Sequence, residues 1–169
     1  MTRYESILID WRDGWKDFGI LVPKDGWKDW LSFPAMKPPF SYNWGDEDGI
    51  EVDLNEVFVK EKNVSLQVLF IAGSQAEFWK NYNALQDTLI APGIRTIYIN
   101  EIGRLFEMYY VESSELSKFT RLKGTNKIAV GMTLKFIMPN PLQEIFMALL
   151  FGTGEDMITE NGNNVLIAI

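Results

Sequence analysis

Long runs of alternating apolar residues constrain the fold of this 169-residue chain more than any other feature. Between residues 127 and 138 every second side chain is large and apolar, which is the period of a β-strand with one buried face. Residues 64–71 alternate in the same way, and their second face becomes apolar toward the end of the run. Aromatic residues make up 14% of the chain, which also favours a β-rich fold or a large contact surface.

Shorter apolar segments predict further strands or extended pieces, at residues 6–10, 19–22, 57–59, 94–100, 105–111 and 116–122. Residues 41–54 predict a hairpin around an acidic, glycine-flanked turn at residues 45–49. On its second strand Ile50, Val52 and Leu54 alternate with two acidic residues. We expect this aliphatic face to be buried and the acidic face to lie in water.

One segment changes from the strand period to the helical one. Ser74 and Glu77 form a capping-box pattern, in which the hydroxyl accepts a free backbone N–H and the carboxylate returns to the cap. Four large apolar residues then follow at helical spacing, and Pro92-Gly93 ends the pattern. We predict one long helix at about residues 75–90, packed on a sheet, with contact between its outer face and another subunit as the alternative. The chain is therefore expected to be a β-rich α+β protein.

Residues 23–40 predict a long loop rich in proline and tryptophan, since Pro34, Pro38 and Pro39 forbid a helix and interrupt a sheet ladder. A pattern of Asp-Gly-Trp-Lys-Asp followed by an aromatic residue occurs twice, at residues 13–18 and 25–30. Asp-Gly is a strong turn signal, because glycine accepts a positive φ. We expect two similar hairpin turns, each with a tryptophan packed beside it; the alternative is a paired aromatic recognition surface.

The last part of the chain, residues 142–169, differs in character from the domain that we expect over residues 1–141. It opens with an apolar run, and Asn161-Gly162 between two further apolar runs predicts a C-terminal hairpin. An apolar final strand needs a partner inside the fold or at the sheet edge of a neighbour. We therefore expect this extension to contribute to subunit contact.

The composition excludes most catalytic chemistry. The chain has no His and no Cys, which removes imidazole bases, thiol nucleophiles, disulfides and the usual zinc and iron–sulfur sites. Its net charge of −7 disfavours stable binding to nucleic acid or to an anionic membrane surface. No signal peptide or membrane-spanning run is visible, so we expect a soluble, non-secreted protein.

Two groups of acidic residues are candidate sites. The turn at residues 46–53 fails as a calcium loop, because Ile50 falls where a third ligand is needed and Glu51 falls where glycine is needed. Carboxylates beside tryptophan at residues 11–17 and 27–29 could in principle cleave a glycosidic bond, but nothing there marks a carboxylic acid with a raised pKa. We expect no enzyme activity, no cofactor and no metal.

Several short pieces follow one another in a recognisable order: the acidic turn, a strand ending at Ile71, Phe78-Trp79 at the start of the helix, Pro92-Gly93, a strand pair through residues 109–111, and a closing strand before Pro139-Asn140-Pro141. From residue 7 to residue 141 this order resembles the N-terminal domain of the distal tail protein of long-tailed bacteriophages, and more loosely the related tail-tube proteins. Residues 158–167 resemble short repeats in phage and prophage tail proteins of gut Bacteroidetes.

The resemblance implies an antiparallel β-sandwich or incomplete barrel flanked by one helix, with a projecting hairpin or long loop. It also implies a structural subunit of a phage or prophage tail, assembled as a hexameric ring around a DNA channel. The partners would be further copies of the chain and neighbouring tube and baseplate proteins, with DNA only as passing cargo. The protein would be made in the bacterial cytoplasm and end in the virion tail. Many distal tail proteins carry a further C-terminal module, for which we expect no counterpart here.

The candidate interface residues are those whose side chains would need a partner: Trp15, Trp27, Trp30, Trp44, Val165, Leu166 and Ile167. The alternative function is a carbohydrate-binding β-sandwich module, in which the same four tryptophans stack on sugars. An enzyme that uses carboxylates is the third hypothesis.

Overall fold

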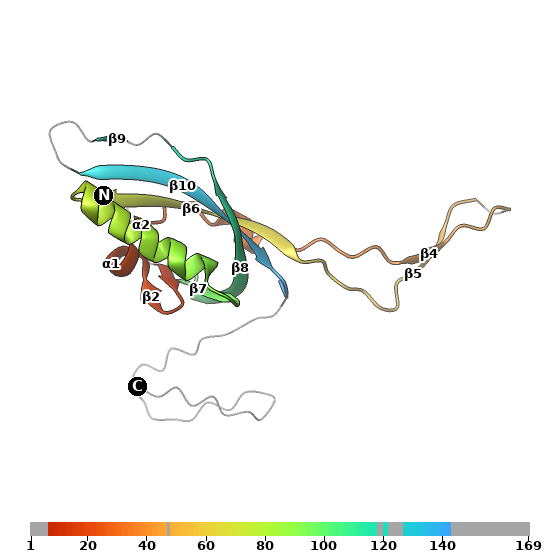
Figure 1. Ribbon diagram of the computed structural model, residues 1–169. Coiled ribbons are helices and arrows are strands. Elements are labelled where there is room, and N and C mark those ends of the chain that lie inside the picture. Colours follow the sequence, from red (N-terminus) through yellow and green to blue (C-terminus); the bar gives the residue numbers. More distant parts are fainter. Residues whose placement is uncertain (1–6, 47, 118–119, 122–126, 143–169) are drawn as a thin grey trace, which may run out of the picture.

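A computed structural model describes residues 7–46, 48–117, 120–121 and 127–142 (Figure 1). One curled sheet dominates, with the strand order β2-β1-β7-β8-β10-β6-β3 and with β9 paired to β10. All of its strand pairs are antiparallel. Its strands are β1 (Ile7–Ile9), β2 (Arg12–Asp13), β3 (Ile20–Leu21), β6 (Lys62–Ala72), β7 (Arg95–Ile99), β8 (Arg104–Ser114), β9 (Thr120–Arg121) and β10 (Ile128–Met138).

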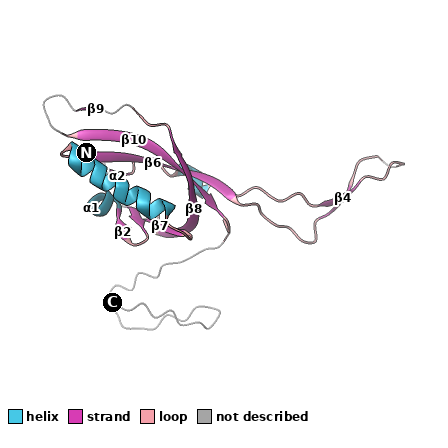
Figure 2. Cartoon of the chain, in the orientation of Figure 1, coloured by secondary structure: helices cyan, strands magenta, loops and turns pink. Residues whose placement is uncertain are grey.

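The long strand β8 makes the sheet curl. Its first half pairs with β7, from Arg104 to Met108, and its second half pairs with β10, from Tyr109 to Ser114. Within the half that pairs with β10 the register shifts, so that Val111 is an extra residue between Tyr110 and Glu112. The sheet therefore forms a half-barrel and not a flat layer, which confirms the predicted β-rich fold with an incomplete barrel and one main helix (Figure 2).

The predicted helix is confirmed as α2 (Gln75–Ile90), which lies along the concave side of the curled sheet (Figure 1). The Glu77 N–H donates to the Ser74 hydroxyl at 3.2 Å, and the Glu77 carboxylate accepts the N–H of Gly73 at 2.7 Å, one residue before the cap. Phe78, Leu85 and Leu89 are buried against the sheet. The Phe78 ring meets Phe70 of β6 edge-on, with ring centroids 5.8 Å apart.

The core follows the alternation seen in the sequence. In both β6 and β10 the buried residues recur at every second position, and the pairing of the two strands runs without interruption from Ile128↔Ala72 to Met138↔Lys62. Among the largest side chains with less than 2% exposure are Phe18, Phe70 and Phe136. The two long sequence runs therefore form the central ladder of the molecule.

A partly buried ion pair joins Asp10, directly after β1, to Arg95, the first residue of β7. Arg95 is 8% exposed, and its guanidinium donates to the Asp10 carboxylate at 2.8 Å. It also donates to the carbonyls of Thr88 and Pro92. The other Asp10 oxygen accepts the Thr96 N–H at 2.8 Å. This network ties the end of the helix to the sheet.

The two copies of the Asp-Gly-Trp pattern fold differently, so the prediction of two similar hairpin turns is wrong. In the first copy Asp13 is extended and caps the short helix α1 (Gly14–Phe18), accepting the N–H groups of Trp15 and Lys16. In the second copy Asp25 has φ +65°, and the chain makes a turn followed by the 3-10 helix η1 (Lys28–Leu31). The tertiary neighbours of each copy decide its conformation.

Candidate assembly interface

Residues 33–61 leave the sheet as a long two-stranded ribbon, which we call the arm (Figure 1). At its base the Lys37 N–H donates to the Phe58 carbonyl and the Lys60 N–H donates to the Ala35 carbonyl, both at 2.8 Å. Farther out β4 (Phe40–Tyr42) pairs with β5 (Glu51–Asp53). The hairpin expected at residues 41–54 is confirmed, and the second strand of the arm continues directly into β6.

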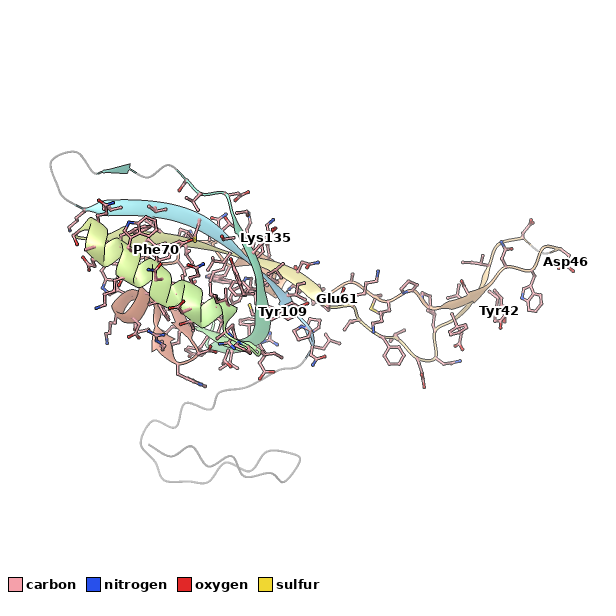
Figure 3. The ribbon with its side chains drawn as sticks, viewed as in Figure 1. Tyr42, Asp46, Glu61, Phe70, Tyr109 and Lys135 are labelled. Carbon is pink, nitrogen blue, oxygen red and sulfur yellow. The ribbon has the colours of Figure 1, made fainter. Side chains whose placement is uncertain are left out.

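The expected burial of one arm face is wrong for the single chain. Ile50, Val52 and Leu54 are 62%, 37% and 64% exposed. Figure 3 shows the arm side chains pointing outward, with no second layer of structure beside them. Of the twenty exposed large hydrophobic residues in the described part of the chain, ten lie on the arm: Phe33, Met36, Phe40, Tyr42, Trp44, Ile50, Val52, Leu54, Val57 and Phe58. A concentration of apolar surface of this kind marks an interaction site.

The strand register divides the arm into two chemically different faces. Residues directly opposite one another share a face, and the pairs are Phe40↔Asp53, Ser41↔Val52 and Tyr42↔Glu51. One face therefore combines aromatic and acidic side chains, and we call it the acidic face. The other face carries Val52 and Ser41, with Ile50 and Leu54 in the same alternation, and we call it the aliphatic face.

On the acidic face, Tyr42 and Trp44 form a stacked pair. Their ring centroids are 5.7 Å apart and their planes are inclined by 16°. The Trp44 indole N–H donates to the Glu51 carboxylate at 2.9 Å. The acidic face is thus organised within the hairpin itself.

A buried lysine holds the root of the arm. The Lys62 ammonium donates to the carbonyls of Trp30 and Ser32, at 2.6 and 2.5 Å, although the residue is only 8% exposed. Burial lowers the pKa of Lys62, against an opposing effect of the nearby Asp29 carboxylate. The ammonium links the residues that precede the arm, in and after η1, to the start of β6, so it helps to set the direction of the arm.

Trp30 strengthens this root from the side. It is 3% exposed, its indole N–H donates to the Ser65 carbonyl at 2.7 Å, and its ring meets Phe106 edge-on at 5.1 Å. The Ser65 hydroxyl donates to the Asp29 carboxylate. A cavity of ≈170 Å³ lies at the same root and is lined in part by Lys62, Arg104 and Met138. Sequence reasoning missed the root, because a lysine inside an alternating strand pattern gives no sign of its partners.

The predicted interface residues do not form one surface. Trp30 belongs to the core, so its expected place at an interface is corrected: no ring face is left for a partner. Trp27 is partly buried against the core, whereas Trp15 on α1 and Trp44 on the arm are 51% and 50% exposed. In Figure 1, α1 and the arm lie at opposite ends of the molecule. Val165, Leu166, Ile167 and the expected C-terminal hairpin lie outside the described residues.

Two structural features are absent from the described residues. No group of three acidic side chains there comes close enough to hold a metal ion. No helix in this part of the chain has the length and the apolar character needed to cross a membrane.

The comparisons with known proteins point to one solved fold. No family model and no curated protein matches the sequence. The structure is similar to the crystal structure of the Dit protein (gp 19.1) of phage SPP1, described as a paradigm of the hub adsorption apparatus in phages that infect Gram-positive bacteria. The TM-score is 0.58 at 15% sequence identity, over 82% of this chain and 51% of the Dit chain. This chain thus spans about half the length of Dit and has a fold similar to that of a phage distal tail hub protein.

Proposed function

We propose that this protein is a structural subunit of a phage or prophage tail, of the distal-tail or tail-tube type, which assembles as a ring around a DNA channel. The observation that carries the proposal is the exposed arm on a Dit-like half-barrel. A chain that leaves so much apolar surface open on a projecting ribbon requires a neighbour to cover it. The same contact, repeated by rotation from copy to copy, closes a ring.

The partners of the ring are other copies of the chain and the adjoining tube and baseplate proteins. We propose a hexamer, located in the virion tail after synthesis in the bacterial cytoplasm. The net charge of −7 suits a channel through which DNA slides without adhering. The role is mechanical and not catalytic, in keeping with a sequence that has neither His nor Cys.

The carbohydrate-binding alternative loses part of its support in the structure. It required a row of exposed tryptophans, but Trp30 is buried and Trp15 lies on a different element from Trp44. Of the four tryptophans, Trp15 and Trp44 stay about half exposed, and Trp44 stacks on Tyr42. Titration of Trp fluorescence with a glycan panel tests this alternative.

Native mass spectrometry with negative-stain imaging of the same sample tests the proposal. We expect a closed ring whose mass is a multiple of 19.4 kDa, with a central opening. A monomer over the whole accessible concentration range, together with a fluorescence response to a glycan, would favour the binding module instead.

A further inference from the structure

We infer that residues 32–34 and Glu61 form a hinge at the root of the arm, and that the ammonium of Lys62 is its lock, which holds the arm at one angle to the half-barrel in the free chain. The inference rests on the proposed function and deepens it, because a ring closes only if every copy presents its contact at the same angle. Its basis is the order of hydrogen bonds along the root.

Directly before the arm, η1 is fixed to β6. The Trp30 indole N–H donates to the Ser65 carbonyl at 2.7 Å, and the Ser65 hydroxyl donates to the Asp29 carboxylate. Trp30 is only 3% exposed, so this attachment is part of the core. The first strand of the arm therefore starts from a fixed point.

The hydrogen bonds of the arm itself begin farther out. The Lys60 N–H donates to the Ala35 carbonyl at 2.8 Å, and from there outward the two strands belong to one ribbon. On the first strand Phe33 and Pro34 lie between η1 and this ribbon. On the second strand Glu61 lies between the ribbon and β6, where the arm meets the half-barrel (Figure 3). A change of backbone angles at these few residues would swing the arm as a unit, which is the action of a hinge.

Packing does not fill the space beside the hinge. A cavity of ≈170 Å³ lies there, lined by Phe33 and Pro34 from the arm and by Phe106 and Met138 from the half-barrel. Phe33 is 97% exposed, so its ring does not close the cavity. Close-packed side chains resist movement because they interdigitate, and at this point the arm and the half-barrel do not. Another restraint has to set the angle of the arm.

Lys62 supplies that restraint. It is the first residue of β6 and pairs with Met138 of β10, so its backbone belongs to the central ladder. Its ammonium donates to the carbonyls of Trp30 and Ser32, and it thereby ties the hinge of the first strand to the sheet. Since Lys62 is only 8% exposed, water cannot easily replace these acceptors, and a buried charge without them is costly. The ammonium is therefore a positioning group for the arm.

The absence of cysteine in the chain allows spin labels to be attached at chosen positions. One pair of labels, at Ser41→Cys on the arm and Lys80→Cys on α2, reports the position of the arm. A second pair, at Lys80→Cys and Glu101→Cys, lies within the half-barrel and reports whether the body is intact. All three positions are exposed. Double electron–electron resonance on dilute monomer measures the distribution of each distance.

Three backgrounds are compared with the wild-type protein. Lys62→Met removes the donor and keeps an unbranched side chain. Lys60→Met, the matched control, makes the same change at an exposed position two residues earlier. Lys62→Arg keeps a charged donor, and the adjacent cavity has room for the larger guanidinium.

We expect a single narrow arm distance in the wild type, Lys60→Met and Lys62→Arg. In Lys62→Met the width of the distribution should increase by roughly twofold or more, because a hinge without its lock moves the whole arm. The distance within the half-barrel should stay the same in all four proteins. A narrow arm distance in Lys62→Met, or a broad one in Lys62→Arg, would overturn the inference. A changed distance within the half-barrel of Lys62→Met would overturn it as well, since the lysine would then hold the body and not the arm.

Native mass spectrometry of the same proteins at high concentration separates the inference from the proposed function. We expect closed rings from the wild type and open or mixed oligomers from Lys62→Met. Equal ring closure in both would overturn the part of the lock in assembly. A wild type with a narrow arm distance that forms no ring would contradict the proposed function and leave the hinge and its lock standing. Rings from a wild type whose arm distance is already broad as a monomer would overturn the lock and leave the proposed function standing.

Discussion

Arg95 carries a buried charge, so the loss of its ion-pair partner should lower the stability of the fold. Asp10→Ala removes the carboxylate at 2.8 Å and leaves a charge that is only 8% exposed without its counterion. We expect a loss of about 3 kcal/mol in the free energy of unfolding, measured by urea denaturation, since an unpaired buried charge costs that much. The control is Glu112→Ala, which breaks the exposed ion pair with Lys135 at 2.7 Å. This variant should leave the urea midpoint unchanged. Equal losses in both variants would contradict this account.

The stability of the protein should depend on pH because of Lys62, which lies at the root of the arm. Burial lowers the pKa of this lysine in the folded chain below the value of 10.5, so in the window between the two values the unfolded chain binds more protons. The wild-type protein should therefore gain stability, relative to Lys62→Met, as the pH rises through that window to 10.5. Urea denaturation of both proteins at a series of pH values from neutral upward measures the difference. A difference that does not change with pH would contradict the buried position of the ammonium.

At the scale of elements, the cap of α2 tests how far local signals stabilise the fold. Ser74→Ala removes the hydroxyl that accepts the Glu77 N–H, and we expect a cost of about 1 kcal/mol in unfolding free energy. Ser74→Asp should retain most of the stability, because a carboxylate also accepts the free N–H groups. A larger loss of unfolding free energy in Ser74→Asp than in Ser74→Ala would contradict the role of the Ser74 side chain as a helix cap.

The arm is an element whose removal should separate folding from assembly. Met36 is directly opposite Val59, so Lys37 and Phe58 can be joined by an Asn-Gly turn in place of residues 38–57. We expect the shortened protein to retain a cooperative thermal transition within a few degrees of wild type, because none of the removed residues belongs to the core. It should stay monomeric in native mass spectrometry. Rings formed by the shortened protein would contradict the role of the arm.

At the scale of the whole molecule, net charge should govern the rate of assembly. Each copy carries a net charge of −7, of which the arm accounts for −5, so copies repel one another and salt screens the repulsion. We expect the association rate, followed by light scattering, to rise as NaCl increases. The double variant Lys37→Glu and Lys60→Glu, which makes the arm more acidic, should increase the salt dependence. A rate that is insensitive to salt would show that repulsion between copies does not limit assembly.

Local period and capping signals were enough to predict several elements. The bounds of α2, the two long strands β6 and β10, and the hairpin at residues 41–54 follow from a capping box, alternation and a glycine-flanked turn. The pairing of β6 with β10 was not predicted. The predicted features depend on neighbours within a few residues, or on a face that is apolar over its whole length. The candidate site was predictable to the same extent: the two faces of the arm can be read from the sequence alternation.

What covers each face depends on contacts between distant parts of the chain. The same alternation is buried in β6 and exposed at Ile50, Val52 and Leu54, because α2 packs on the sheet and nothing in the described structure packs on the arm. Likewise one Asp-Gly-Trp copy became a helix and the other a turn, and Trp30 entered the core while Trp44 did not. Burial depends on residues distant in the chain, such as the β6 lysine that holds the arm root, and a local pattern does not contain them.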